Sequence, residues 1–421
     1  MLAYLQSLFD LKDVNTSVYK SAGRKSPPLL CFGFPKWEGD YMTSTVQLLS
    51  ELAMYHEVLY VEYPFTLTDL WRGRAPARRL LGLEPRQRSV SLPNGAGLHV
   101  LTLPPFLPAN WTPSTNWHLQ LMRWNSRLAR SVVRPALRRL GFERPVVVNA
   151  FQPALGSLLR GAFNERLLLY YCYDEISAAP WIKKHGAISE RRFLPQADAV
   201  ITSSRQLAGA KRAGNTCCYT VLNGVDDQRF RPLALSGEAP FEAAGYRAVV
   251  GYLGSVDLRL NYQLLGEVIA RCPEYLFIFV GRVNHPGGQG QLDSFDNVRL
   301  LGSQPPDSLP HFVQHFDLGI IPFLDNELTA GIYPLKVNEY LAMGKPVVAT
   351  TFGDMSDFRE HIQLADNAEA FRKAIVRALA ENHPEEREQR IAFARQNSWR
   401  KRAEQLHELI MRLTTEKSDR N

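Results

Sequence analysis

The feature that most constrains the fold of this 421-residue chain is the alternation of short apolar runs with longer segments of helical period. Each apolar run ends in glycine or polar residues. Buried parallel strands read as continuous apolar runs, and helices join them, so the pattern predicts an α/β fold with parallel sheets. The predicted strands are 27–34, 57–64, 97–104, 144–151, 167–175, 197–204, 217–224, 247–256, 275–283, 297–302, 317–323 and 345–350.

These strands fall into two groups. Between them, residues 231–246 are rich in Pro, Gly and Ala and show no clear period, which is typical of a linker. We therefore predict a Rossmann-like domain over 1–230 and a second one over 247–395. A helical segment, 396–421, follows. The natural ligand site of such a chain is the cleft between its two domains.

Several function classes are not favoured by the composition. No run of about 18 apolar residues occurs, so a transmembrane helix is not expected. The first residues, MLAYLQSLFDLKD, lack the basic start of a secretory signal. The five cysteines (31, 172, 217, 218 and 272) show neither metal-ligand spacing nor a disulfide framework, which favours a reducing cytoplasm.

The formal net charge is +7, and arginines gather in two stretches of the N-terminal half. Residues 71–88 contain six arginines and residues 123–144 contain seven. A solvated helix face is one interpretation. Attraction to anionic lipid headgroups or to a phosphate-bearing substrate is the other. Nucleic acid is less favoured, because no nucleic-acid-binding module is recognisable.

Two C-terminal segments have residues suited to a phosphate ligand. GYLGSVDLRLNY (251–262) is a strand, a glycine loop and a helix start, which lets the backbone approach an anion; a plain tight turn is an equally good interpretation. GIYPLKVNEYLAMGKPVVAT (331–350) predicts a short helix with Lys336 and Glu339 on one face. A carboxylate can accept both hydroxyls of a ribose, and a lysine near a helix N-terminus can meet a diphosphate. An exposed ion pair of little consequence is the alternative.

The second segment resembles the donor-site signature of the retaining GT-B glycosyltransferases of family 4 (group 1). The resemblance rests on Glu339, Tyr340, Gly344 and the Pro-Val-Val-Ala-Thr of 346–350. The YPLK before Glu339 resembles a branch with teichuronic-acid and exopolysaccharide transferases. Further similar segments, in the family's order over about residues 145–405, are ADAVITSS (197–204), VLNGVDDQRF (221–230), NVRLLGSQPPDSLPHFVQHFDLGIIPF (297–323) and Ser398-Trp399.

The resemblance implies a GT-B fold, with two Rossmann-like domains facing a cleft and the C-terminal helix (396–421) returning to the N-terminal domain. It implies transfer of a sugar, with retention, from a nucleotide-diphosphate donor to a glycan or lipid-linked acceptor in cell-surface polysaccharide synthesis. We expect a UDP-linked donor. Glu339 would hold the ribose, and Lys336 with Arg259 would stabilise the diphosphate. The expected donor-binding residues are Gly254, Ser255, Gly281, Arg282, Leu301, Gly331, Ile332, Tyr333, Lys336 and Glu339.

This donor site differs from the family pattern at two places. Gly331 occupies the position of a second glutamate that normally holds the transferred sugar. Ser255 and Leu260 replace an arginine and a lysine, and Arg259 is expected to substitute. The departures motivate an alternative, a non-catalytic nucleotide- or sugar-binding protein with the GT-B fold. A related GT-B epimerase or phosphorylase is less favoured, because no lysine set for pyridoxal phosphate can be identified.

The N-terminal half is expected to supply the acceptor side. The acceptor-side candidates are Trp37, Glu38 and Asp40, in the loop after the first strand. Asp174, at the end of the strand in 167–175, is a third catalytic candidate beside Lys336 and Arg259. No Asp-x-Asp motif occurs in a suitable loop, so we expect no metal and no cofactor, with the nucleotide-sugar as co-substrate. We expect a cytoplasmic protein that contacts the inner face of an anionic membrane and binds no nucleic acid.

Overall fold

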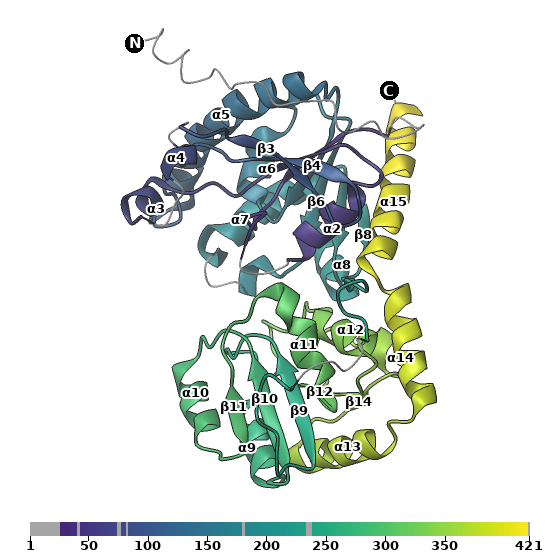
Figure 1. Cartoon of the computed structure of the whole chain (residues 1–421). Helices are drawn as coiled ribbons and strands as arrows, with labels where there is room; N and C mark the ends of the chain where they lie inside the picture. The colour runs from purple at the N-terminus through teal and green to yellow at the C-terminus, as the bar shows by residue number, and fades with distance from the viewer. Residues whose placement is uncertain are drawn as a thin grey trace. The chain divides into compact units, whose positions relative to one another are not determined.

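The computed structural model of the chain describes residues 26–39, 43–73, 77–80, 83–178, 182–232 and 238–419 (Figure 1). The chain divides into two compact units. The first comprises Met1–Val221 with Ala403–Asn421, and the second comprises Leu222–Arg402. Each unit contains a mainly parallel sheet with helices, so the predicted α/β class is confirmed. The N-terminal residues on which the signal-peptide prediction rests lie outside the described residues.

The first unit is built on an eight-stranded sheet of order β3-β4-β2-β1-β5-β6-β7-β8. Strand β3 pairs antiparallel with β4, and the other pairings are parallel. Its elements are β1 (Leu29–Phe32), α2 (Ser44–Leu52), β2 (Val58–Val61), α3 (Leu67–Trp71), α4 (Ala77–Leu80), β3 (Gln87–Ser91), β4 (Gly97–Leu101), α5 (Thr115–Leu140), β5 (Val146–Ala150), α6 (Pro153–Leu159), β6 (Leu167–Cys172), α7 (Lys183–Phe193), β7 (Ala199–Thr202), α8 (Arg205–Lys211) and β8 (Cys218–Thr220).

The second unit is built on a six-stranded parallel sheet of order β11-β10-β9-β12-β13-β14. Its central strands are buried along their whole length, as expected for a sheet covered on both faces. The elements are β9 (Ala248–Leu253), α9 (Tyr262–Ala270), β10 (Tyr275–Val280), α10 (Pro286–Asp293), β11 (Val298–Leu300), α11 (Leu309–Gln314), β12 (Leu318–Ile321), α12 (Leu335–Ala342), β13 (Val347–Ala349), β14 (Gln363–Leu364), α13 (Ala368–Ala380) and α14 (Pro384–Gln396).

The unit boundaries differ from the predicted domain limits. Residues 222–230 belong to the second unit, although we placed them in the N-terminal domain. The reason is a set of backbone bonds: Val225 N–H donates to Asn397 O at 3.0 Å, and Trp399 N–H donates to Val225 O at 3.0 Å. These bonds join the end of the first half of the sequence to the tail. Strands β3 and β14 were not predicted, because one lies in an arginine-rich stretch and the other is two residues long.

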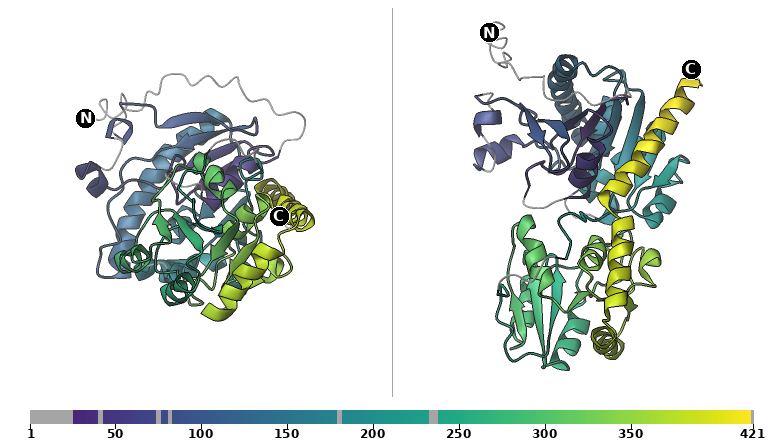
Figure 2. Two further views of the ribbon diagram at one scale, coloured as in Figure 1. Left: turned by 60° about the horizontal axis from the view of Figure 1, so that its bottom comes forward. Right: turned by 45° about the vertical axis from the view of Figure 1, so that its right-hand side comes forward.

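The last helix, α15 (Trp399–Asp419), packs on the first unit from Ala403 onward (Figure 2). Lys417 Nζ lies 2.7 Å from Asp198 Oδ2, and the guanidinium of Arg412 lies over the Tyr219 ring. The His407 ring stacks on Tyr55 with centroids 4.7 Å apart. The tail of the chain therefore packs on the N-terminal half.

Strands β9 and β12 mark the point where the order of the second sheet reverses, because the chain adds β10 and β11 on one side of β9 and β12 to β14 on the other. In open α/β sheets such a switch point is where ligands bind, beyond the carboxyl ends of the strands. Pairing of β9 with β10 continues to Leu253, whereas pairing with β12 ends at Gly251. The two central strands therefore separate at their carboxyl ends.

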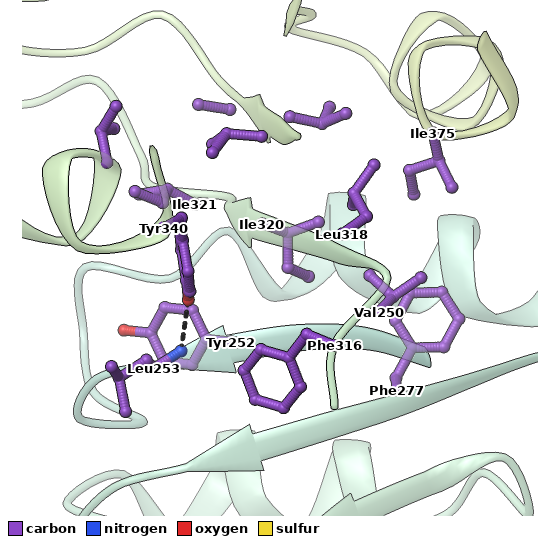
Figure 3. Packing of buried hydrophobic residues seen from close by; sticks show 14 of the residues in the cluster. Val250, Tyr252, Leu253, Phe277, Phe316, Leu318, Ile320, Ile321, Tyr340 and Ile375 are labelled. Atoms are coloured by element: carbon purple, nitrogen blue, oxygen red, sulfur yellow. Dashed lines mark hydrogen bonds between the residues drawn. The ribbon is translucent and has the colours of Figure 1, made fainter. Parts of the chain in front are cut away.

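Tyr340, from α12, occupies the place where β9 and β12 separate. Its hydroxyl oxygen accepts the Leu253 N–H at 2.6 Å, which would otherwise lack a strand partner (Figure 3). The ring fits because Gly319 has no side chain; a Cβ there would lie 2.6 Å from the ring. Burial raises the pKa of Tyr340 well above its usual range, so the hydroxyl keeps its proton.

Among the described residues, no helix is long and apolar enough to cross a membrane.

We predict that Tyr340→Phe destabilises the second unit by about 1–3 kcal/mol, because it leaves the buried Leu253 N–H without an acceptor. The matched control is Tyr246→Phe, which removes an exposed hydroxyl bonded to Asp296 O at 3.3 Å. That substitution is expected to change the free energy of unfolding by no more than about 0.5 kcal/mol. Denaturant unfolding of both variants measures the difference, and equal losses would contradict this role of Tyr340.

We predict that the stability of the first unit falls as the pH drops from about 6.5 to 4. Burial lowers the pKa of His56 to about 4, and its ring nitrogens meet Pro27 O at 2.8 Å and His407 at 3.0 Å. Below an unfolded pKa of about 6.5 the unfolded chain binds a proton that the folded chain does not, which favours unfolding. His56→Gln should reduce this pH-dependent loss by up to about 3 kcal/mol.

The matched control for this pH experiment is His383→Gln, which changes an exposed histidine of the second unit. Unfolding free energies between pH 4 and 7 should show the wild-type slope for this control. A wild-type slope for His56→Gln would show that other groups cause the loss of stability.

Candidate functional site

The loop at 254–261, after β9, runs past the carboxyl ends of β10 and β12. Val256 N–H donates to Arg282 O at 2.9 Å, beyond β10. Leu324 N–H, beyond β12, donates to Arg259 O at 2.7 Å. The loop is therefore bonded on both sides of the switch point. It is positioned to form one wall of a site at that edge of the sheet.

Glycines allow the loops after β9 and β10 to approach closely. A Cβ on Gly281 would lie 2.0 Å from the carbonyl oxygen of Gly254, so no side chain fits there. The Gly254 N–H already donates to Val280 O at 2.9 Å. Of the two N–H groups predicted to face a phosphate, only that of Ser255 lacks an acceptor within the described part of the chain. The glycine loop thus offers fewer donors than predicted.

Helix α12 brings the predicted charged pair together at its first turns. It begins directly after Pro334 and is followed by Gly344, whose φ of 72° lies in the left-handed region. Lys336 Nζ lies 2.7 Å from Glu339 Oε2. The lysine side chain is 32% exposed and the glutamate 10%, so the carboxylate is mostly buried and the ammonium reaches solvent. Such a pair places an acceptor and a cation side by side near a helix N-terminus, whose dipole favours anions.

Arg259 is held by its own loop. Its guanidinium makes two hydrogen bonds to the Asp257 carboxylate, at 2.9 and 2.6 Å, and lies over the Phe323 ring. The side chain remains 31% exposed. An anionic ligand that contacts Arg259 would therefore share its guanidinium with Asp257.

The remaining donor-side candidates lie around this edge. The carbonyl of Ile332 accepts from Asp354 N–H at 2.9 Å, and that of Tyr333 accepts from Asn223 Nδ2 at 3.0 Å. These bonds fix the 331–333 backbone in place. Arg282 is exposed after β10, and Leu301 is partly buried after β11. Asn223 was not among the predicted site residues; its place in the Asn-Gly-Val-Asp element was the only signal.

The predicted acceptor-side residues of the first unit separate into three cases. Trp37 is 9% exposed and packs edge-on against Tyr60, so little of its ring is available to stack on a sugar. Glu38 is 68% exposed and lies 3.3 Å from Arg88. Asp40 lies outside the described residues.

A buried charged network at the carboxyl ends of β2 and β4 was missed by the sequence reasoning. The Glu62 carboxylate accepts from Thr102 Oγ1 at 2.7 Å, from Trp37 N–H at 3.1 Å and from Arg88. Burial by itself raises the pKa of Glu62, but the bonds from Thr102 and Arg88 outweigh it and hold the pKa below its ordinary value. Lys36 lies over the Phe65 ring, and burial lowers its pKa to about 8. No sequence motif marks these residues.

Asp174 follows β6 and is partly buried, as predicted for a strand end. Its neighbour Glu175 is held by Lys211 Nζ at 2.8 Å, and the same ammonium binds the buried Glu190 at 2.8 Å. Two further polar residues at the end of β5, Asn149 and Gln152, bond to backbone: Gln152 Nε2 donates to Gly33 O at 2.9 Å and Asn149 Nδ2 donates to Gln152 O at 3.0 Å. These contacts hold the backbone of the neighbouring loops in place.

Residues 247–381 match the model of the family described as glycosyl transferases group 1. The chain is also 26% identical over 264 residues to the Bacillus subtilis (strain 168) protein TuaH, which is named as a glycosyltransferase of teichuronic acid biosynthesis. That match covers 58% of this chain and 66% of TuaH, slightly under two thirds of the relative. The family match therefore contains the α12 pair, Lys336 and Glu339.

Solved structures resemble the chain over most of its length. The sucrose-phosphate synthase of Thermosynechococcus elongatus has a TM-score of 0.68 at 18% identity, covering 93% of this chain and 100% of that one. Anabaena HepE, in complex with UDP and glucose, has a TM-score of 0.58 at 16% identity, covering 91% of this chain and 99% of that one. The trehalose-phosphate synthase (UDP-forming) of Burkholderia xenovorans, with glucose-6-phosphate, has a TM-score of 0.63 at 11% identity, covering 92% of this chain and 100% of that one. At these identities the likeness shows the fold, which is the predicted GT-B fold.

We predict that Gly281→Ala destabilises the second unit by at least about 2 kcal/mol, because its Cβ would overlap the Gly254 carbonyl and the loops would have to separate. The matched control is Gly290→Ala. Gly290 lies inside α10, where a Cβ meets nothing within 4 Å, so alanine should stabilise by up to about 1 kcal/mol. Thermal unfolding of both variants checks the opposite signs. Stabilisation by both would show that the close approach does not constrain the loops.

Proposed function

We propose that this chain is a glycosyltransferase that moves a sugar from a UDP-linked donor to a glycan or lipid-linked acceptor in cell-surface polysaccharide synthesis, with retention. The observation that carries the proposal is the family match over 247–381, which contains all the donor-side candidates. The name of TuaH supports the polysaccharide assignment. A non-catalytic binding protein is not favoured, since the matched family and this relative are both glycosyltransferases.

In the proposed complex, Glu339 accepts hydrogen bonds from the two ribose hydroxyls. The low exposure of its carboxylate suits this role, because a hydrogen bond to a charged acceptor strengthens where water is excluded. Lys336 then turns from Glu339 toward the diphosphate, so that its ammonium still has an anionic partner. The ribose hydroxyls replace the contact that the carboxylate loses.

Departure of the nucleoside diphosphate places negative charge on the β-phosphate as the bond to the sugar breaks. Lys336, the Ser255 N–H and the first turn of α12 are the proposed stabilisers of that charge. Arg259 contributes while it remains bonded to Asp257, which neutralises part of its charge. The UDP complex of HepE and the UDP-forming synthase favour UDP over other nucleotides as the leaving group.

The acceptor is proposed to bind through the first unit, with Glu38 and Asp174 as its polar contacts. We propose that neither a metal nor another cofactor takes part and that the nucleotide-sugar is the co-substrate. The free cysteines, four buried and one exposed, are consistent with the cytoplasm as the place of action.

We predict that UDP binds the wild-type protein and that Glu339→Ala weakens binding roughly tenfold to a hundredfold, as expected for the loss of hydrogen bonds to a charged group. Calorimetric titration with UDP, GDP and ADP measures this. Release of UDP from a panel of UDP-sugars, with and without candidate acceptors, then tests transfer itself.

The matched control for Glu339 is Glu369→Ala. Glu369 forms the same kind of ion pair three residues along a helix, with Arg372 at 3.2 Å, but on α13. UDP affinity should not change in this control. Equal affinities for Glu339→Ala and wild type would overturn the assignment of the ribose site, and nucleotide binding without turnover on any sugar nucleotide would favour the non-catalytic alternative.

A further inference from the structure

Among the described residues, four tryptophans of the first unit are exposed. Trp71, Trp111, Trp117 and Trp124 are 86, 70, 66 and 60% exposed. Tryptophan is usually well buried, and an exposed cluster of large apolar side chains marks an interaction surface. Three exposed leucines accompany them in sequence: Leu67, Leu83 and Leu107.

Hydrogen bonds connect the segments that bear these side chains. Leu67 N–H, at the start of α3, donates to Phe106 O at 3.0 Å. Both the N–H and the carbonyl of Leu107 bond to the Asn125 amide of α5, each at 2.9 Å. Figures 1 and 2 show α3, α4 and α5 on the same side of the first unit. We call this set, α3, residues 105–112 and the exposed face of α5, the tryptophan surface.

Helix α5 arranges its exposed residues in one stripe. Trp117 and Trp124 are two turns apart, so they lie on one face. Arg127, Arg134 and Arg138 continue that face toward the C-terminus and are exposed. The Arg127 guanidinium lies 5.1 Å from the centre of the Trp124 ring. The opposite face packs into the unit; its buried residues are His118, Asn125, Ser126, Ala129, Val133, Ala136 and Leu137.

The α5 part of the tryptophan surface and residues 105–112 lie in a segment whose charges have one sign. Residues 85–142 contain eight arginines and no aspartate or glutamate. Since the whole chain has a formal net charge of +7, this segment accounts for the entire excess. Among the described residues, no carboxylate forms an ion pair with Arg123, Arg127, Arg134 or Arg138. Their charges are therefore available to an external anion.

We propose that the tryptophan surface binds peripherally to a bilayer that contains anionic phospholipids. An indole has an apolar body and one polar N–H, and it is favoured at the boundary between headgroups and acyl chains. A guanidinium binds phosphate through two hydrogen bonds, and the negative potential of an anionic leaflet attracts the arginines. Tryptophans followed by arginines along one helix face fit such a boundary.

Other partners fit the surface less well. The core of a protein interface is depleted of charged residues, whereas arginines adjoin the tryptophans here. Proteins that bind single-stranded nucleic acid stack bases on aromatic rings along a basic groove, whereas these tryptophans lie on the outer face of a helix and on neighbouring loops. The inference does not rest on the proposed function, because binding to vesicles requires no sugar donor.

The test is flotation of the full chain with vesicles of phosphatidylcholine alone or with phosphatidylglycerol added at about a third of the lipid. We expect the wild type to float with the anionic vesicles and not with the neutral ones. Replacing Arg123, Arg127, Arg134 and Arg138 by Gln should weaken binding roughly tenfold or more, since each arginine near the surface contributes. Trp117→Ser with Trp124→Ser should weaken the binding that persists at high salt and reduce the quenching of tryptophan emission by brominated lipid.

Two matched controls separate the surface from general charge and hydrophobicity. The first replaces four cations of the second unit by Gln, namely Arg271, Arg372, Lys373 and Arg377. The second replaces the exposed Met54 and Val376 by Ser. Both should float as the wild type does, and circular dichroism confirms that each variant is folded. Absence of flotation, equal flotation by the arginine variant and its control, or tighter binding to a single-stranded oligonucleotide than to the vesicles would overturn the proposal.

Discussion

The hydrogen bond from the Leu253 N–H to the Tyr340 hydroxyl joins the sheet of the second unit to the helix that carries the charged pair. It is needed because β9 and β12 stop pairing at Gly251, which leaves a strand amide without a backbone acceptor. A buried amide without a partner is costly, so the separation of the strands depends on a side chain that reaches in from α12. The same separation is what opens the carboxyl edge of a parallel sheet to a ligand.

The position of Tyr340 also explains why α12 can hold charge near its N-terminus and still precede the buried β13. Tyr340 and Glu339 are consecutive residues of the helix and point about 100° apart, so fixing the tyrosine against the sheet also fixes the direction of the glutamate. The carboxylate is mostly buried and is balanced by Lys336 at 2.7 Å. Replacing an ammonium by ribose hydroxyls keeps such a carboxylate hydrogen-bonded, which is the physical basis of the proposed donor site.

The two units differ in how much of their chemistry is local in sequence. In the second unit, Lys336 and Glu339 lie one turn apart, and the glycine loop follows its strand directly, so pattern and resemblance could locate them. In the first unit, Glu62 meets Thr102, Arg88 and Trp37 from three other segments. No spacing rule predicts such a set. The burial of Trp37 was not predicted for the same reason, because its ring packs against Tyr60, a residue of β2.

Local sequence patterns were enough to predict the α/β class, the two sheets, the α12 helix from its proline to its glycine, and the concentration of arginines in the first half. These depend on residue periodicity, on backbone preferences of glycine and proline, and on charge counts, all of which are local. Tertiary packing was needed to show that Arg259 is bound to Asp257 and that the Gly254 N–H already donates to Val280. The same holds for the place of residues 222–230 in the second unit and for the exposure of Trp71, Trp111, Trp117 and Trp124. These outcomes depend on which distant segments pack together, and on how each buried donor finds an acceptor.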